Sequence, residues 1–367
     1  MASRHFAEDY DSGESLQEQY FDGYADLGVH RVMLADEPRM SFYRHVMTCD
    51  AVVRGRVVVD VGSGTGILSM WAARAGARHV FSIEASPLRH VQAEVLADNG
   101  LSESVTLLPD TVENVVGRGA ASFVAQHGAV LQGCGVSVVV SEWMGFYLLH
   151  EGMLSSVVRA RDFFNEVNVL LGISRPVEMV PDRATIHVAP MSCHPYYEER
   201  YRRFWGSVDG VDLSRYGAME YETHLESAAP LIDTVPPACL LHEGALLAEL
   251  DLAAVSADAV ASLCKTVHFD FPTSAVFSER FTAVDPPRVV VDGFTLWFDV
   301  SFRDAVLSTS PRCPPTHWKQ TTILLPASVR AEELVEFTST DVTLDVEVRL
   351  VATDDLQRCY TIELELK

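Results

Sequence analysis

The chain has 367 residues, 48% hydrophobic and 22% charged, a composition typical of a globular protein with room for two domains. Its formal net charge of −23 disfavours nucleic acids and anionic membranes as partners and favours cationic ones, although an acidic surface can also serve solubility alone. No apolar run approaches the roughly 18 residues of a membrane helix, and the polar N-terminus lacks the apolar segment of a secretory signal.

We expect residues 1–17 to be disordered and residues 18–48 to form two helices. Asp36 is the expected N-cap of the second helix, with Pro38 in its first turn. The expected helix faces are Tyr20, Tyr24 and Leu27 on the first, and Arg39, Tyr43 and Met47 on the second.

Strands and helices alternate over residues 49–180. VVVDVGSGTG (57–66) is a β-branched run that ends in a glycine-rich turn, and a helix follows up to Gly76. A second strand at 79–86 precedes a helix with Ser86 as N-cap and Gly100 as its stop. The segments SVTLLPD and VSVVVSEWMG give two more strands. This alternation predicts a parallel, doubly wound, Rossmann-like sheet.

Residues 181–367 alternate apolar and polar side chains with period 2, as in ATIHVAP, TTILLP and VTLDVEVRLVA. They predict a mostly antiparallel β-barrel or sandwich. A helical insert at 194–217, rich in aromatics and arginines, suits an arm spanning 190–222 that contacts a partner. The seven cysteines form no CxxC pair, so we expect free thiols in a reducing compartment and neither a zinc site nor a redox pair.

The glycine-rich turn is the expected nucleoside site. Gly62, Gly64 and Gly66 follow a strand and open a helix, but their spacing does not match GxGxxG, which disfavours a pyrophosphate ligand. Glu84 ends the next strand, where a carboxylate can accept hydrogen bonds from ribose hydroxyls. Glu113 follows the third strand and could receive an adenine amino group. The alternative is a tight turn with a surface glutamate. The pattern resembles class I S-adenosylmethionine-dependent methyltransferases.

The segment SEWMGFYLLHEGM (141–153) indicates the acceptor. Glu142 ends a buried strand, and Glu151 follows across a turn that contains Gly145. Two acids at one mouth of the sheet need a cation between them, or one would bind a proton. The planar, permanently charged guanidinium of arginine fits paired carboxylates best. The alternative is two unrelated surface glutamates.

Several separate stretches together resemble the protein arginine methyltransferase family from about residue 18 onward. The stretches are YFDGY (20–24), HRVML (30–34), DVGSGTGIL (60–68), IEAS (83–86), the two-glutamate loop, PDRA (181–184) and THWKQ (316–320). SEWMGFYLLHEGMLSSV and VLSTSP…THWKQ are most similar to the sixth branch of that family. The chain departs from the family pattern in three places. The segments at 113–135 and 163–181 are longer than usual, and Ser137 stands where the family commonly has aspartate.

The resemblance implies a role for individual residues. Glu142 and Glu151 would clamp the substrate guanidinium, and His317 with Asp36 would complete the active site. Tyr20, Phe21 and Tyr24 would lie on a lid helix over the cofactor, and Tyr20 would also face the substrate. S-adenosylmethionine would be bound by Tyr24, His30, Arg39, Asp60, Gly62, Gly64, Glu84, Val112 and Glu113, with Arg39 on the methionyl carboxylate. Met33, Met153 and Trp318 would line the substrate pocket, with Trp318 packing its loop in place.

The resemblance also implies partners and products. The expected substrates are basic, arginine- and glycine-rich proteins or histone tails, and the arm would make a homodimer. The expected cofactor product is S-adenosylhomocysteine, without a metal, and the two methionines favour asymmetric dimethylarginine over core filling alone. We expect a cytoplasmic protein, with the nucleus left open. The alternatives are an inactive regulatory scaffold of the same fold and a methyltransferase for a small molecule or nucleic acid.

Overall fold

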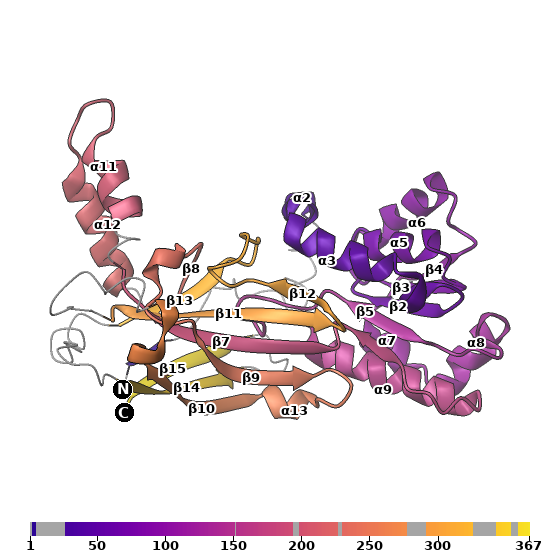
Figure 1. Cartoon of the computed structure of the whole chain (residues 1–367). Coiled ribbons are helices and arrows are strands. Elements are labelled where there is room, and N and C mark those ends of the chain that lie inside the picture. The colour runs from indigo at the N-terminus through magenta and orange to yellow at the C-terminus, as the bar shows by residue number, and fades with distance from the viewer. Residues whose placement is uncertain are drawn as a thin grey trace.

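The computed structural model describes residues 2–4, 26–150, 152–193, 198–226, 230–276, 291–325, 343–353 and 359–367. Tyr20, Phe21, Tyr24 and Glu151, whose roles the sequence predicts, lie outside these ranges. A helical and parallel-sheet half stands beside a long antiparallel half, from which a helical arm projects (Figure 1). Within the described ranges, no helix is long and apolar enough to cross a membrane.

The parallel sheet forms as predicted, because its strands are short, β-branched runs buried on both faces. All residues of β2, β3 and β5 are buried, and the pairings between neighbouring strands are parallel in the order β4-β3-β2-β5-β6. The strands are β2 (Val57–Val61), β3 (His79–Ile83), β4 (Val105–Leu108), β5 (Val138–Ser141) and β6 (Glu178–Val180).

Helices cover both faces of this sheet. Figure 1 places α5 and α6 above it and α7 and α9 below it, with α8 at the far end. Phe81 of β3 packs against Phe123 and His127 of α8, at ring-centroid distances of 5.2 and 4.9 Å. The segment at 113–135, which is longer than the family pattern, therefore contributes a helix that packs on the core. The helices are α5 (Ile67–Arg74), α6 (Arg89–Asp98), α7 (Val112–Gly117), α8 (Ala120–Leu131) and α9 (Leu154–Leu170).

The N-terminal helices follow the predicted signals. Helix α2 spans Leu27–Ala35, α3 spans Glu37–Met47 and the short α4 spans Asp50–Val53. Asp36 is the N-cap of α3, and its side chain accepts a hydrogen bond from the Arg39 backbone amide, as predicted.

Two local predictions were wrong. Helix α6 begins at Arg89 rather than directly after Ser86, because the Ser86 hydroxyl accepts from the Leu88 amide in a preceding turn at 3.3 Å. Residues Ala2–Arg4, expected to be disordered, form strand β1 on β15. An edge strand offers unpaired backbone groups that such a segment can pair with.

The C-terminal half is antiparallel, as predicted. One sheet has the order β8-β13-β11-β7-β9 with β12 on β11, and the other has the order β1-β15-β14-β10. Side chains alternate between core and surface along β14, for example. The strands are β7 (Arg183–Met191), β8 (Leu231–Asp233), β9 (Ala245–Asp251), β10 (Ser262–Asp270), β11 (Gly293–Phe302), β12 (Ala305–Ser308), β13 (Gln320–Leu324), β14 (Thr343–Ala352) and β15 (Tyr360–Leu366). Short helices are η2 (Pro237–Cys239), α13 (Ala257–Val260) and η3 (Phe271–Thr273).

The helical insert projects away from the sheets (Figure 1). It contains η1 (Glu198–Arg203), α11 (Phe204–Gly206) and α12 (Ser214–Glu226), while residues 194–197 of the predicted segment lie outside the described ranges. Phe204, Tyr216 and Met219 are 62%, 56% and 60% exposed. Such apolar exposure is typical of a contact surface rather than of an isolated helix pair.

Polar contacts fix the two halves against each other. Arg161 of α9 donates to the backbone oxygens of Leu252 and Val255 at 2.9 and 2.8 Å. Glu178 of β6 bridges Arg56 and Arg303, at 2.7 and 2.9 Å. Since Arg303 follows β11, this bridge joins the parallel sheet to the antiparallel half.

Candidate functional site

A cavity of about 330 Å³ opens at the carboxyl ends of β2, β3 and β5. Ligands bind at this edge in open α/β sheets. Its walls come from α2, from the glycine-rich turn, from the turns after β3, β4 and β5, and from the THW segment before β13. Sequence-predicted residues on these walls are His30, Met33, Arg39, Gly62, Gly64, Glu84, Val112, Glu113, Glu142, Met153, His317 and Trp318.

The glycine-rich turn presents backbone to the cavity. Gly62, Gly64 and Gly66 have φ values of 69°, 55° and 77°, a region that side chains disfavour. A Cβ on Gly62 would collide with Met153, and one on Gly64 would lie 3.1 Å from the His30 ring. Glycine is thus needed here both for conformation and for close approach.

Glu84 closes the other side of this turn. Its two carboxylate oxygens accept from the Gly64 amide at 2.5 Å and from the Ser86 amide at 2.6 Å. The backbone thus holds the carboxylate at the cavity wall, at the strand end where a carboxylate suits ribose hydroxyls.

Asp60 does not line the cavity, contrary to its predicted contact with the cofactor. It is 1% exposed, and its Oδ2 accepts from the Ser69 amide and hydroxyl at 3.0 and 2.7 Å. Burial raises the pKa of Asp60 to about 7, although the bonds from Ser69 oppose this rise. Asp60 therefore fixes the start of α5 from behind the glycine-rich turn.

Arg39 and Glu142 form a buried ion pair on the cavity wall. The Arg39 Nη2 lies 3.0 Å from the Glu142 Oε2, and the side chains are 7% and 12% exposed. Nη1 donates to the Met33 backbone oxygen at 3.2 Å. Burial acts to lower the pKa of Arg39, but the charge and hydrogen bond of Glu142, with smaller contributions from Tyr43 and Asp36, together outweigh burial and raise it, so the guanidinium stays charged.

Asp36 joins the start of α3 to the THW segment. Its Oδ2 accepts from the His317 backbone amide at 2.8 Å and lies 2.6 Å from the His317 Nδ1. Burial would raise the pKa of Asp36, but the hydrogen bonds from His317 and Arg39 outweigh burial and lower it. The ring of His317 is thereby oriented at the cavity edge, next to Trp318 at a centroid distance of 4.0 Å.

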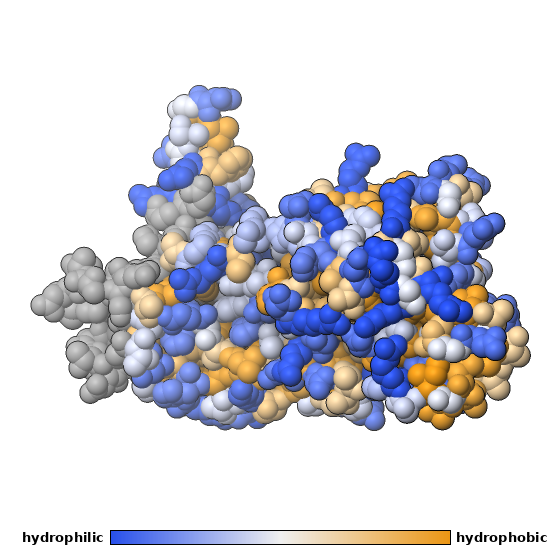
Figure 2. All heavy atoms as spheres, turned by 45° about the vertical axis from the view of Figure 1, so that its right-hand side comes forward, coloured by the Kyte–Doolittle hydropathy of each residue, from blue (hydrophilic) through white to orange (hydrophobic). Residues whose placement is uncertain are grey.

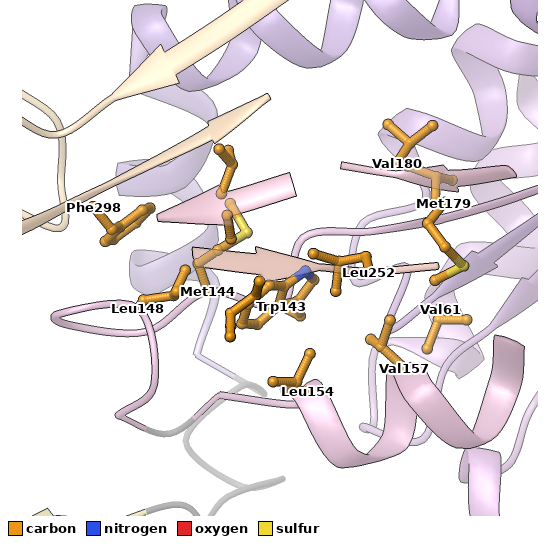
Figure 3. Packing of buried hydrophobic residues seen from close by; sticks show 14 of the residues in the cluster. Val61, Trp143, Met144, Leu148, Leu154, Val157, Met179, Val180, Leu252 and Phe298 are labelled. Atoms are coloured by element: carbon orange, nitrogen blue, oxygen red, sulfur yellow. The ribbon is translucent and has the colours of Figure 1, made fainter. Parts of the chain in front are cut away.

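The segment after β5 is held from both sides. The Met153 amide donates to the Trp143 backbone oxygen at 3.2 Å, which closes the loop, and a Cβ on Gly145 would overlap the His150 backbone. The Trp318 indole donates to the Met144 backbone oxygen at 2.9 Å. Figure 3 shows Trp143 and Met144 packed among Leu148, Leu154 and Leu252. This packing fixes the backbone on which Glu142 stands. Glu151, on the same loop, lies outside the described residues, and its role stays a prediction.

The sequence did not reveal one polar contact at the far end of the cavity. The Ser156 hydroxyl at the start of α9 donates to Glu113 Oε1 at 2.6 Å. Both residues line the cavity, as do Val112 and Asp110. A serine in the first turn of a helix gives no local signal that it orients a carboxylate 43 residues earlier.

Together these residues suit a nucleoside linked to an amino acid, next to a carboxylate that binds a guanidinium. No cluster of three or more His, Cys, Asp and Glu side chains suited to a metal ion occurs within the described ranges. None of the seven cysteines forms a disulfide bond.

Known proteins are similar in sequence to this chain over most of its length. Residues 182–367 match the family model described as the arginine methyltransferase oligomerization subdomain. Protein arginine N-methyltransferase 1 of Schizosaccharomyces pombe is 33% identical over 316 residues, which are 85% of this chain and 80% of that protein. Probable protein arginine N-methyltransferase 6 of Arabidopsis thaliana is 31% identical over 358 residues, covering 86% of this chain and 73% of that protein.

Solved structures of proteins with related names are also similar to this chain. A crystal structure of PRMT6 with SAH is 59% identical, with a TM-score of 0.89 over 93% of this chain and 100% of that chain. A PRMT1 enzyme-prozyme complex of Trypanosoma brucei with AdoHcy is 27% identical, with a TM-score of 0.67 over 94% and 95%. The chain belongs to the protein arginine N-methyltransferase family.

Proposed function

We propose that this enzyme transfers methyl groups from S-adenosylmethionine to the guanidinium nitrogens of arginine side chains in basic proteins. The observation that carries the proposal is the Arg39–Glu142 pair: the carboxylate assigned to the substrate already binds a guanidinium within the chain. Arg39 contacts only Oε2, so Oε1 is the oxygen left for a second guanidinium.

The cavity fits the cofactor. Its glycine-rich turn admits a ligand against the backbone, Glu84 suits a ribose, and Glu113 with Ser156 suits the polar edge of an adenine. Arg39, the buried cation on the wall, suits the methionyl carboxylate. The similar structures of PRMT6 with SAH and of the Trypanosoma brucei complex with AdoHcy support the same choice.

When bound, S-adenosylmethionine supplies a methyl group that already has a good leaving group. The remaining difficulty lies with the acceptor, because the nitrogens of a guanidinium share one delocalised positive charge. Glu142, held in a poorly solvated wall, draws that charge toward itself and leaves another nitrogen richer in electrons. We propose Glu151 as the second carboxylate of this clamp.

The product must lose a proton. His317 stands at the cavity edge with its Nδ1 held by the Asp36 carboxylate, which orients the ring toward a proton-accepting role. We propose this pair as the proton acceptor, with Glu151 as the alternative.

We propose mono- and asymmetric dimethylarginine as products. Met33 and Met153 both line the cavity, and Met153 packs directly against Gly62. Two flexible thioethers at these positions would restrict where an already methylated nitrogen can lie.

Basic, arginine- and glycine-rich proteins or histone tails are the proposed substrates, since the net charge of −23 would steer cationic segments toward the enzyme. The oligomerization subdomain and the exposed apolar residues of the arm support a homodimer. Localisation in the cytoplasm, with the nucleus as the alternative, is a proposal from the sequence alone.

The second candidate is an inactive regulatory scaffold. Incubation with labelled S-adenosylmethionine and an arginine-rich peptide, followed by mass spectrometry, separates the two. Asymmetric dimethylarginine supports the full proposal, and symmetric dimethylarginine contradicts the product type. An unlabelled peptide at micromolar enzyme favours the scaffold.

A further inference from the structure

A buried glutamine lies behind the glycine-rich turn. Gln92 is 2% exposed and, with Leu96, forms the buried face of α6. An apolar side chain would fill such a position without the cost of burying an amide. A polar residue here therefore calls for partners that use it.

The Gln92 amide joins the turn to the neighbouring strand. Its Nε2 donates to the Ser63 hydroxyl at 2.9 Å and to the Gly64 backbone oxygen at 3.0 Å. Its Oε1 accepts from the hydroxyl of Ser82, in β3, at 3.2 Å. All of its polar atoms are thus engaged, and two of the three bonds end on the turn.

Packing adds to these bonds. A Cβ on Gly66 would lie 2.9 Å from Gln92 Nε2 and 3.2 Å from its Cγ, so the side chain presses directly on the turn. Gly64 is held by its carbonyl on the Gln92 side and by its amide on the Glu84 side. The peptide units that face the ligand are therefore clamped between α6 and the end of β3.

We infer that Gln92 is a positioning residue that holds the glycine-rich turn in its ligand-binding conformation and so sets the affinity for S-adenosylmethionine. Three left-handed glycines at alternate positions, Gly62, Gly64 and Gly66, form a turn with many accessible conformations. If only a fraction of the molecules has the turn in its binding conformation, the apparent affinity is the intrinsic affinity multiplied by that fraction. Gln92 does not line the cavity, so it acts through Ser63 and Gly64.

The inference rests on the cofactor proposed above, and calorimetric titration with S-adenosylhomocysteine tests it. Gln92→Met keeps an unbranched side chain of similar size and removes all three bonds. We expect its Kd for S-adenosylhomocysteine to rise about tenfold, because two of the lost hydrogen bonds are modest bonds that hold the turn. The KM for S-adenosylmethionine should rise equally, while the KM for peptide and kcat at saturating cofactor stay unchanged.

A merely structural role predicts a different result: Gln92→Met would melt at a lower temperature, while its folded fraction would bind with the wild-type Kd. Gln92→Glu adds a second readout. Its carboxylate would face the Gly64 carbonyl, and only its protonated form could donate, so lower pH should partly restore its affinity. Gln92→Met should not respond in this way.

Glu94→Gln, at an exposed position of the same helix, is the matched control and should bind as wild type does. Should Gln92→Met fail to fold, Ser82→Ala decides, because it removes only the bond that orients the amide and should weaken binding about threefold. A Kd within twofold of wild type in the deciding variant overturns the inference. Failure of the wild-type chain to bind S-adenosylhomocysteine would instead overturn the proposed cofactor.

Discussion

The guanidinium of Arg39 and the carboxylate of Glu142 lie 3.0 Å apart, although 103 residues separate them in the chain. The pair links α3 to the end of β5 and stands on the wall of the cavity. Tyr43, one turn after Arg39, donates to the Ser141 backbone oxygen at 3.1 Å and strengthens the same link. The binding site and the stability of the N-terminal helices are therefore coupled.

Removing one partner of this pair should destabilise the chain more than removing both. Arg39→Met leaves Glu142 charged and buried, which should cost about 3 kcal/mol in the free energy of unfolding. Glu142→Gln in the Arg39→Met background should recover part of that loss. Urea unfolding of the two single variants and the double variant measures the coupling, and strictly additive losses would contradict the ion pair.

The Asp36–His317 contact predicts an acid-sensitive contribution to stability. The pKa of Asp36 is lowered below 3.8 because hydrogen bonds from His317 and Arg39 outweigh the effect of burial. A depressed pKa contributes stability that is present above pH 3.8 and is lost as the pH falls through the folded-state value. Asp36→Asn should lower the free energy of unfolding by about 1–2 kcal/mol at pH 7, with a deficit that shrinks in acid.

Urea titrations between pH 3 and pH 7 test this difference. The control is Asp98→Asn, which alters an exposed aspartate at the end of α6 and should change little at any pH. A deficit of Asp36→Asn that stays constant over this range would contradict the assignment.

Asp60 predicts the opposite dependence on pH. Its folded-state pKa is raised from 3.8 to about 7 by burial, so the folded chain holds this proton more tightly than the unfolded chain does. The contribution is complete below pH 3.8 and is lost as the pH rises through 7, by on the order of 4 kcal/mol. Asp60→Asn cannot ionise, so its free energy of unfolding should fall less between pH 5 and pH 8 than that of the wild type. Equal slopes in the two proteins would show that Asp60 ionises normally.

The arm predicts an oligomer. Phe204 and Met219 are 62% and 60% exposed. Two large apolar side chains this exposed on one projecting element suit a surface that contacts a partner. Figure 2 shows hydrophobic residues next to hydrophilic ones on the projecting arm. A double variant, Phe204→Glu with Met219→Glu, should give a monomer by light scattering at micromolar concentration.

Ala121→Glu adds a negative charge at an exposed position of α8, away from the arm, and should leave the oligomer intact. A wild-type chain that is already monomeric would contradict the proposed homodimer.

The sequence predicted those parts of the fold that local patterns encode. The β-branched run before Gly62 and the Asp36–Pro38 signal gave β2 and the start of α3, because strand burial and helix capping depend on neighbouring residues. The start of α6 was misplaced, because Ser86 can cap either a helix or a turn.

The site was less accessible to sequence reasoning. His317 and Asp36 are 281 residues apart, and no local pattern pairs them; their expected proximity came only from the family resemblance. Asp60 was predicted to contact the cofactor, but its carboxylate is buried and accepts hydrogen bonds from Ser69 instead. Gln92 looked like any polar residue of an amphipathic helix, because its role depends on how α6 packs on the turn.

One measurement tests the central claim most directly: methyl transfer to an arginine-rich peptide by Glu142→Gln, with S-adenosylhomocysteine binding measured on the same protein. The exposed Glu103→Gln serves as the control. If Glu142 holds the substrate guanidinium, kcat should fall about 10²-fold or more while binding of S-adenosylhomocysteine persists. Turnover by Glu142→Gln at the rate of Glu103→Gln would contradict the account.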